Sequence, residues 1–265
     1  MRANKKTPLW SLNIESSSHT SYLFGTMHVR DARAFKLLEI IKSKLSECDH
    51  FYAEVNMEFM QSAIVTNAQK LQNGLTLSSL LGQKKYSKSK KVIARHFDIN
   101  LDIFNDFLPI LTVNQLLSFH LNKEHKEALD QTLYNIAKLN NCQVHGLETM
   151  EEHLSVLGEI PIEDQVKQFK SLIKSPAKFK KKIDQMADVY ETGDIYKLYK
   201  SSKKSMGQLR KLMIYDRNRL MSKVILEKLG ESSFYAVGAG HLAGKYGLIA
   251  LLKTNGVSVK PILKS

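Results

Sequence analysis

The stretch SYLFGTMH, Ser21–His28, is an apolar, strand-like run that ends in Gly25 and is followed three residues later by His28. FYAVGAGH, Phe234–His241, repeats this order near the end of the chain. Aligned on the glycine, both read Y-x-x-G-x-x-H. The composition, with 13 Gly and 9 His in 265 residues, gives about 0.4 GxxH strings by chance. The strings alone therefore carry little weight, and their flanks decide their meaning.

Both GxxH stretches are flanked by the same predicted elements, a strand before and a helix and a strand after. The first half has strands at 8–14, 22–24 and 50–56 and a helix at 31–45 with Asp31 as N-cap; the second has strands at 234–237 and 257–262 and a helix at 242–254. Pro261 ends the last strand or places it at a sheet edge. Strand–GxxH–helix–strand halves predict an α/β fold in which right-handed crossovers set both GxxH turns at one edge of a central sheet.

The region between these halves, residues 57–230, is predicted to be mainly helical, with one strand at 142–145 and a helix at 205–229. No Gly/Ser-rich or Pro-rich linker marks a second domain. We therefore expect one domain over residues 1–265. Its sheet comes from residues 1–56 and 231–265, and residues 57–230 form a large helical insertion or cap.

The composition is that of a globular protein, with 43% hydrophobic residues. Cys48 and Cys142 are too few for a disulfide framework and lack metal or redox spacing. The N-terminal segment lacks the apolar run of a signal peptide, and no apolar window is long enough for a membrane span. The sequence as written is expected to be cytoplasmic, and a trimmed leader would instead indicate an envelope or secreted protein.

The net charge of +13 comes mostly from lysines, clustered at 84–91 and 178–182. Such charge can indicate a nucleic acid or an anionic membrane surface as partner. No zinc-finger, RNP or other nucleic-acid motif accompanies the lysines, and lysines spread along helices usually form a solvated face. Nucleic acid is therefore not the expected partner.

His28 and His241 are the first candidates for chemistry, because a histidine after a sharp turn at a sheet edge stands exposed above the strands. The alternative is that both histidines cap turns or fill the core. Glu54, in FYAEV at 51–55, places a carboxylate where a strand buried on both faces needs an apolar residue. An ionised carboxylate there needs a metal, an arginine or another cation. The alternative is a glutamate on an edge strand facing water.

Arg217 is anomalous for a different reason. Its neighbours three and four positions away on the predicted helix are Met213, Ile214, Leu220 and Met221, all apolar. A guanidinium among them should pair with a carboxylate or face an anionic group. The alternative is an arginine that extends along the margin of the apolar stripe to reach water.

Five segments together resemble the TraB/GumN family, which includes the PrgY-like pheromone shutdown proteins and the Tiki proteases that act on Wnt ligands. They are YLFGTMH at 22–28, AEVN at 53–56, GLET at 146–149, YDRNRLM at 215–221 and AVGAGHLAGKYGLIALLKTNGVSVKPI at 236–262. They occur in the family's order and span nearly the whole chain. This sequence differs from many relatives in showing neither a leader peptide nor a membrane anchor.

The resemblance implies a divalent-metal-dependent hydrolase, with manganese or cobalt the expected ion and zinc a third candidate. It also implies pseudo-repeated α/β halves similar to the erythromycin esterase and ChaN-like group. The family histidines correspond to His28 and His241, its acidic residue to Glu54, and its arginine to Arg217 with Asn218 beside it. Glu148 corresponds to the glutamate of GLET, and with Asn218 it is expected to bind the substrate.

The mechanism expected from this resemblance is metal-assisted hydrolysis of a peptide bond, with His28, Glu54 and His241 as metal ligands. Arg217 would steady the oxyanion or orient Glu54. In a second variant, Glu54 or one histidine is a general base that binds no metal. Two alternative functions remain: a non-catalytic protein that sequesters a peptide, and an esterase-like hydrolase of a small molecule.

Overall fold

The chain separates into two compact units in the computed structural model, which describes residues 6–59, 63–207 and 209–263. The first unit comprises Met1–Glu58, Lys123–His153 and Met186–Ser265; the second comprises Phe59–Asn122 and Leu154–Gln185. Much of the expected helical insertion, residues 123–153 and 186–230, thus belongs to the unit that contains the sheet.

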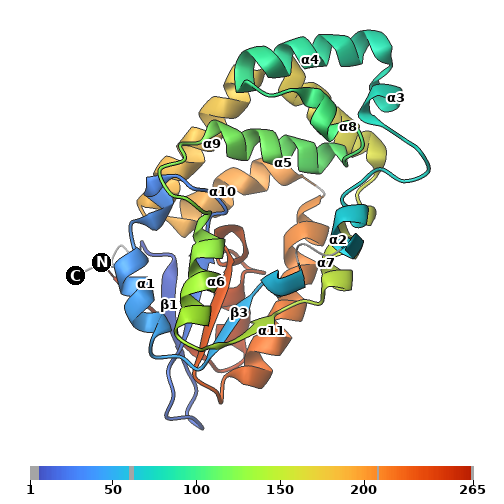
Figure 1. Ribbon diagram of the computed structural model, residues 1–265. Coiled ribbons are helices and arrows are strands. Elements are labelled where there is room, and N and C mark those ends of the chain that lie inside the picture. The colour runs from blue at the N-terminus through green and yellow to red at the C-terminus, as the bar shows by residue number, and fades with distance from the viewer. Residues whose placement is uncertain (1–5, 60–62, 208, 264–265) are drawn as a thin grey trace. The chain divides into compact units, whose positions relative to one another are not determined.

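The first unit is built on a six-stranded sheet with the order β4-β3-β5-β2-β1-β6 (Figure 1). Its strands are β1 Leu9–Asn13, β2 Ser21–Thr26, β3 His50–Ala53, β4 Gln143–Gly146, β5 Ser233–Gly238 and β6 Ser258–Pro261. β4, β3, β5 and β2 run parallel, whereas β1 is antiparallel to both β2 and β6. The predicted α/β fold with a central sheet is confirmed, and Pro261 ends a strand that lies at the sheet edge as predicted.

The two GxxH strands are direct neighbours. β2 and β5 pair in parallel, with Gly25 opposite Val237 and Thr26 opposite Gly238. The carboxyl ends of parallel strands lie at the same edge of a sheet, so both GxxH turns leave the sheet at that edge, as the sequence predicts. Their glycines are offset by one residue in this register.

Alternation along the strands gives the sheet two apolar faces. On one face Tyr22, Phe24, Phe51 and Phe234 lie with ring centroids 6.3–6.4 Å apart in their contacting pairs. In Figure 1, α1 Leu38–Leu45 and α6 Leu129–Leu139 lie side by side against the sheet. The opposite face packs on α10 Ile195–Met206, α11 Arg217–Lys228 and α12 Leu248–Thr254.

Three predicted helices begin or break at different residues from those expected. The helix at 31–45 is a 3₁₀ turn, Ala32–Phe35, capped by Asp31, followed by α1. The helix at 242–254 begins only at Leu248, after a second 3₁₀ turn at Ala239–His241. A Cβ on Gly247 would lie 2.4 Å from the carbonyl oxygen of Leu242, so the chain turns tightly before α12.

The helix predicted at 205–229 is also divided. α10 ends at Met206 and is followed by Gly207, whose φ is 53°. The segment Lys211–Asp216 is π-helical and leads directly into α11, which begins at Arg217. Short π-helical segments are often found at functional sites.

The described residues of the second unit are mainly helical and contribute no strand to the sheet. A 3₁₀ turn at Met57–Phe59 leads from the first unit into the second. The elements of the second unit are α2 Ala63–Ala68, α3 Leu77–Leu81, α4 Gln83–Phe97, a 3₁₀ turn Leu101–Phe104, α5 Pro109–His120, α8 Ile162–Lys174 and parts of α7 Met150–Gly158 and α9 Pro176–Glu191. Leu77, Ile93, Leu101, Leu116 and Phe169 are fully buried in its core. Within the described ranges, no helix has the length and apolar character needed to cross a membrane.

Candidate active site

The carboxyl ends of the four parallel strands carry the candidate residues. His28 follows β2, Glu54 follows β3, Glu148 follows β4 and His241 follows β5. β3 lies between β4 and β5, so Glu54 is not on an edge strand. The alternative of an edge glutamate facing water is therefore wrong, and the site forms at the sheet edge where α/β folds bind their ligands.

Arg217 is the centre of a buried ion-pair network. Its side chain is 7% exposed, and it donates from Nε to Glu148 Oε1 at 2.9 Å and from Nη2 to Glu148 Oε2 at 2.8 Å. Nη2 also donates to Glu54 Oε2 at 2.5 Å. The Glu148 side chain is 1% exposed. The prediction that Arg217 pairs with a carboxylate is confirmed, and it joins two carboxylates from neighbouring strands.

Both glutamates are held ionised. Burial alone would raise the pKa of Glu54, but His241, the Arg217 charge and the hydrogen bond donated by the Gly238 N–H at 2.7 Å together hold that pKa well below its usual range. Burial also opposes ionisation of Glu148, and hydrogen bonds with His153 and Arg217 outweigh it, so the Glu148 pKa is lowered. Arg217 therefore faces two carboxylates and its own pKa is raised, despite the opposing effect of burial.

His241 is buried and has a defined tautomer. The Asn218 amide nitrogen donates to the backbone carbonyls of His241 at 3.1 Å and Tyr246 at 2.6 Å. Asn218 Oδ1 must then be the atom that accepts from His241 Nδ1 at 2.6 Å. The proton of the neutral ring is on Nδ1, and Nε2 keeps its lone pair. Burial lowers the pKa of His241 to about 4, so the ring is neutral near pH 7.

The free lone pair of His241 Nε2 lies 3.7 Å from Glu54 Oε1. A neutral imidazole nitrogen and a carboxylate oxygen are both acceptors, so this contact has no proton to share. The pair fits a divalent cation chemically, because imidazole and carboxylate form the mixed donor sets that manganese, cobalt and zinc accept. Asn218 accepts a hydrogen bond from Nδ1, as the acceptor that orients a metal-binding histidine usually does.

His28 is in a different environment from His241. Its side chain is 73% exposed, and its Nδ1 lies 3.2 Å from Asp130 Oδ2, at the start of α6. The Thr26 hydroxyl donates to the other oxygen of Asp130 at 2.5 Å. The hydrogen bond with Asp130 is the main cause of the raised pKa of His28. Within the described ranges, no three His, Cys, Asp or Glu side chains stand in a metal-binding arrangement.

Gly25 is required by close packing between the two GxxH turns. A Cβ at this position would lie 2.5 Å from Leu242 Cδ1 and 3.0 Å from the Cα of Ala239. The carbonyl of Gly25 accepts a hydrogen bond of 2.7 Å from the buried Tyr190 hydroxyl. The first turn is thus fixed against the second from one side and by α9 from the other.

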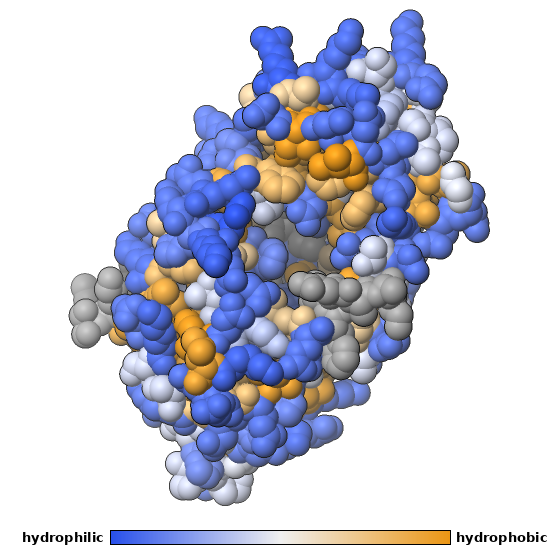
Figure 2. All heavy atoms as spheres, in the orientation of Figure 1, coloured by the Kyte–Doolittle hydropathy of each residue, from blue (hydrophilic) through white to orange (hydrophobic). Residues whose placement is uncertain are grey.

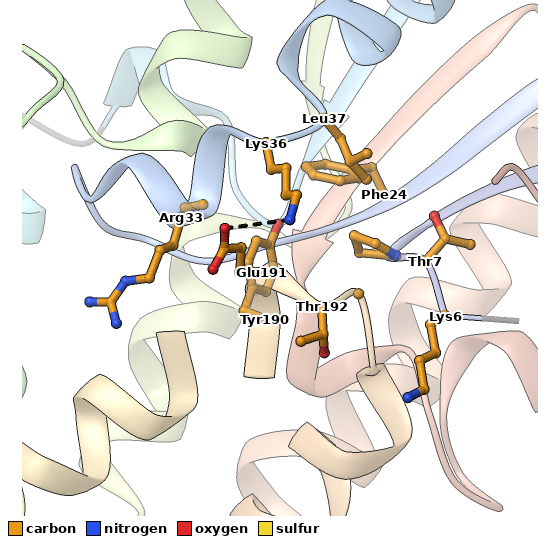
Figure 3. Close-up of a pocket in the computed structure, with 12 residues that line it drawn as sticks. Lys6, Thr7, Phe24, Arg33, Lys36, Leu37, Tyr190, Glu191 and Thr192 are labelled. Carbon is orange, nitrogen blue, oxygen red and sulfur yellow. Dashed lines mark hydrogen bonds and ion pairs between the residues drawn. The ribbon is translucent and has the colours of Figure 1, made fainter. Parts of the chain in front are cut away.

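A separate pocket, of about 180 Å³, lies beside β2 and is lined in part by Phe24, Leu37 and Tyr190 (Figure 3). Its cations are already paired. Lys36 lies 3.4 Å from Glu191, the contact drawn in Figure 3, and Arg33 and Lys6 pair with aspartates elsewhere. The pocket therefore offers no free charge to a ligand.

The lysine clusters lie on helices of the second unit and face water. Lys84, Lys85, Lys88 and Lys91 are exposed on α4, and Lys178 and Lys181 are exposed on α9. Much of the face shown in Figure 2 is hydrophilic, broken by separate hydrophobic patches. These lysines have the solvated arrangement expected from their spacing.

Sequence reasoning brought together five of the residues found here and missed three others. Glu54, Glu148 and Arg217 form one hydrogen-bonded network, and the hydrogen-bonded pair of Asn218 and His241 lies beside it, with His241 Nε2 3.7 Å from Glu54 Oε1. His28 is bound by Asp130 instead. The missed residues are His153, whose Nδ1 lies 3.3 Å from Glu148 Oε2, Asp130 and Thr26. An acidic residue in the first turn of a helix was the only available signal for Asp130. His153 gave no sequence signal.

The sequence is similar to a known protein family and to a named relative over most of its length. The profile of the TraB/PrgY/gumN family matches residues 8–261. The chain is 22% identical over 322 aligned positions to the protein named Metalloprotease TIKI2 from Danio rerio, covering 97% of this chain and 62% of that protein. The chain thus spans less than two thirds of the length of this relative. No solved structure gives a significant match.

Proposed function

The chain belongs to the TraB/PrgY/gumN family, and from this premise and the geometry of the site we propose that it is a divalent-metal-dependent hydrolase that cleaves peptide bonds. The observation that carries the proposal is the pair of acceptors formed by His241 Nε2 and Glu54 Oε1, 3.7 Å apart at the carboxyl edge of the sheet. Similarity to a protein named a metalloprotease supports the choice of a peptide as substrate.

The proposed metal site uses His241 Nε2, Glu54 and His28. The first two donors face each other, and His28 comes from the neighbouring strand end with an exposed ring. A bound divalent ion would polarise the scissile carbonyl and lower the pKa of its water. Manganese and cobalt are the proposed ions, with zinc as the third candidate.

Arg217 is proposed to act through Glu54 and Glu148. Its Nε and Nη2 atoms are engaged by these carboxylates, which supports the role of orienting Glu54 over that of steadying an oxyanion. With Arg217 and the Gly238 N–H bound to its two oxygens, Glu54 stays ionised and in one orientation. In the variant without metal, the lone pair of His241 Nε2 would accept the proton of the attacking water.

The test is a measurement of bound metal followed by turnover. The purified chain is analysed for metal content, then assayed on a peptide library and an ester panel with manganese, cobalt or a chelator. We expect peptide cleavage that the chelator abolishes and that H28A and H241A each reduce by at least 100-fold, the lower range for losing a catalytic group. The matched control is H19A, because His19 is an exposed histidine outside the site.

Other outcomes assign other functions. Tight peptide binding without cleavage would indicate a sequestering protein, and turnover of esters alone would indicate an esterase-like hydrolase. If H28A and H241A both retain full metal-dependent cleavage, the proposed site is wrong.

A further inference from the structure

Arg210 is a buried cation without a counter-ion. It is 4% exposed, and Nε, Nη1 and Nη2 all lack a hydrogen-bond partner. Among the residues that the structure describes, no carboxylate forms an ion pair with it. A guanidinium keeps its proton at any physiological pH. Burying such a charge costs several kcal/mol unless an opposite charge compensates it, so the free chain has an unmet requirement for an anion at this point.

Aromatic rings occupy the neighbourhood of Arg210 without supplying that anion. The Arg210 Cζ atom lies 4.1 Å from the centroid of the Tyr199 ring and 5.5 Å from that of Tyr215. Burial, followed by a hydrogen bond with Tyr215, raises the pKa of Tyr199, and the neighbouring Arg210 guanidinium opposes this rise without reversing it, so the Tyr199 hydroxyl stays neutral. Stacking on a ring covers the face of a guanidinium, whereas its N–H groups point outward in its own plane. The donors of Arg210 therefore remain unsatisfied in that plane.

The cluster around Arg210 is built from close contacts next to the second GxxH turn. A Cβ on Gly244 would lie 2.2 Å from the Tyr199 ring, so only glycine lets this ring pack there. The Tyr215 ring contacts that of Tyr246, with centroids 4.7 Å apart. The carbonyl of Tyr246 accepts from the same Asn218 amide that holds His241. Arg210 is thus linked to His241 through Tyr215, Tyr246 and Asn218.

We infer that Arg210 is the anchor of a recognition site for a carboxylate, held by two parallel N–H···O bonds beside the loop that carries His241. A planar carboxylate matches the guanidinium fork, and the half-buried rings of Tyr199 and Tyr215 lie beside it. The anion site stands on Arg210 alone. Its assignment to the carboxylate of a peptide substrate, at the chain terminus or on an acidic side chain, rests on the proposed hydrolase function.

The first test measures anion binding and needs no catalysis. Thermal unfolding of the full chain is followed in acetate, in inorganic phosphate and in chloride at equal ionic strength. We expect saturable stabilisation by acetate and phosphate over chloride, lost in R210M and weakened in R210K, whose amine lacks the fork. R219M is the matched control, because Arg219 is exposed and pairs with Asp216. Equal stabilisation in R210M and in the unsubstituted chain would overturn the anion site.

The second test identifies the source of the carboxylate. kcat/KM is measured for peptides with a free terminal carboxylate, with an acidic side chain, or with neither, the termini being amidated. We expect the unsubstituted chain to prefer one carboxylate peptide about 10- to 100-fold, the range for a hydrogen bond to a charged group, and R210M to bring that ratio close to one. If R210M loses stabilisation by acetate but keeps the preference, the substrate assignment is overturned and the anion site stands. If no peptide is cleaved, the proposed function fails and the first test still decides the anion site.

Discussion

Replacing Arg217 with methionine should destabilise the first unit strongly, because it leaves two carboxylates without their cation. The Glu148 side chain is 1% exposed and that of Glu54 is 24% exposed, and Arg217 binds both at distances between 2.5 and 3.0 Å. Removing one partner of a buried ion pair costs roughly 3–5 kcal/mol. We therefore expect the free energy of unfolding of R217M to fall by about that amount at pH 7.

The loss in R217M should depend on pH with a definite sign. In the unsubstituted chain the pKa values of Glu54 and Glu148 lie below the ordinary 4.5, so their contribution is present above pH 4.5 and is lost at lower pH. Without Arg217, burial instead raises the pKa of Glu148 above 4.5. The variant then binds more protons folded than unfolded and gains stability as pH falls from 8 to 5. The difference in the free energy of unfolding between the unsubstituted chain and R217M should therefore narrow as pH falls from 8 to 5.

Trp10 provides the assay. It is the single tryptophan of the chain, it is 2% exposed, and it lies in β1 of the first unit. Its fluorescence during urea unfolding at several pH values reports the stability of that unit. R219M should change stability by less than about 1 kcal/mol, as exposed pairs do. R217M/E148Q should recover part of the loss. The reasoning would be refuted if R217M lost less than about 1 kcal/mol of unfolding free energy. It would also be refuted if the difference in stability between R217M and the unsubstituted chain widened as pH falls.

Three further predictions concern the two GxxH turns. G25A should lower stability by about 1–3 kcal/mol and reduce cleavage, since its Cβ would meet Leu242 at 2.5 Å; unchanged urea unfolding and activity would contradict this. With a folded pKa of about 4 against 6.5 unfolded, His241 contributes stability that is complete above pH 6.5 and is lost as pH falls toward 4. H241Q should remove about 2 kcal/mol of the difference in the free energy of unfolding between pH 7 and pH 4.5; the same pH difference in H241Q and in the unsubstituted chain would count against this prediction. D130N should lower the pKa of His28, measured by NMR titration; an unshifted titration would show that Asp130 does not charge the ring.

The sheet and its active edge could be predicted because they depend on local patterns. A glycine and histidine after an apolar run indicate where a strand ends, and the repeat of this order indicates two equivalent strand ends. Glu54 and Arg217 were found as exceptions to apolar patterns, which sequence periodicity detects well. β2 and β5 pair directly and in parallel, so both strand ends lie at one edge of the sheet.

The partners of these residues could not be predicted in the same way. Arg217 and Glu148 are 69 positions apart, and Glu148 only becomes a partner because β4 lies next to β3. The start of α12 at Leu248 was missed because packing of the loop after His241 overrides its helical pattern. The divided helix before Arg217 was missed for the related reason that a π-helical segment has the same apolar spacing to within a residue.

The two histidines show most clearly what a motif leaves open. His28 and His241 have the same local sequence order, and each is held at Nδ1 by a side chain from a different helix. Asp130 supplies a negative charge to an exposed ring and raises its pKa, whereas Asn218 supplies a neutral acceptor to a buried ring whose pKa falls to about 4. The repeated motif therefore gives two histidines whose pKa values are shifted in opposite directions. This difference arises from the partner that each ring meets on α6 or α11, outside both motifs.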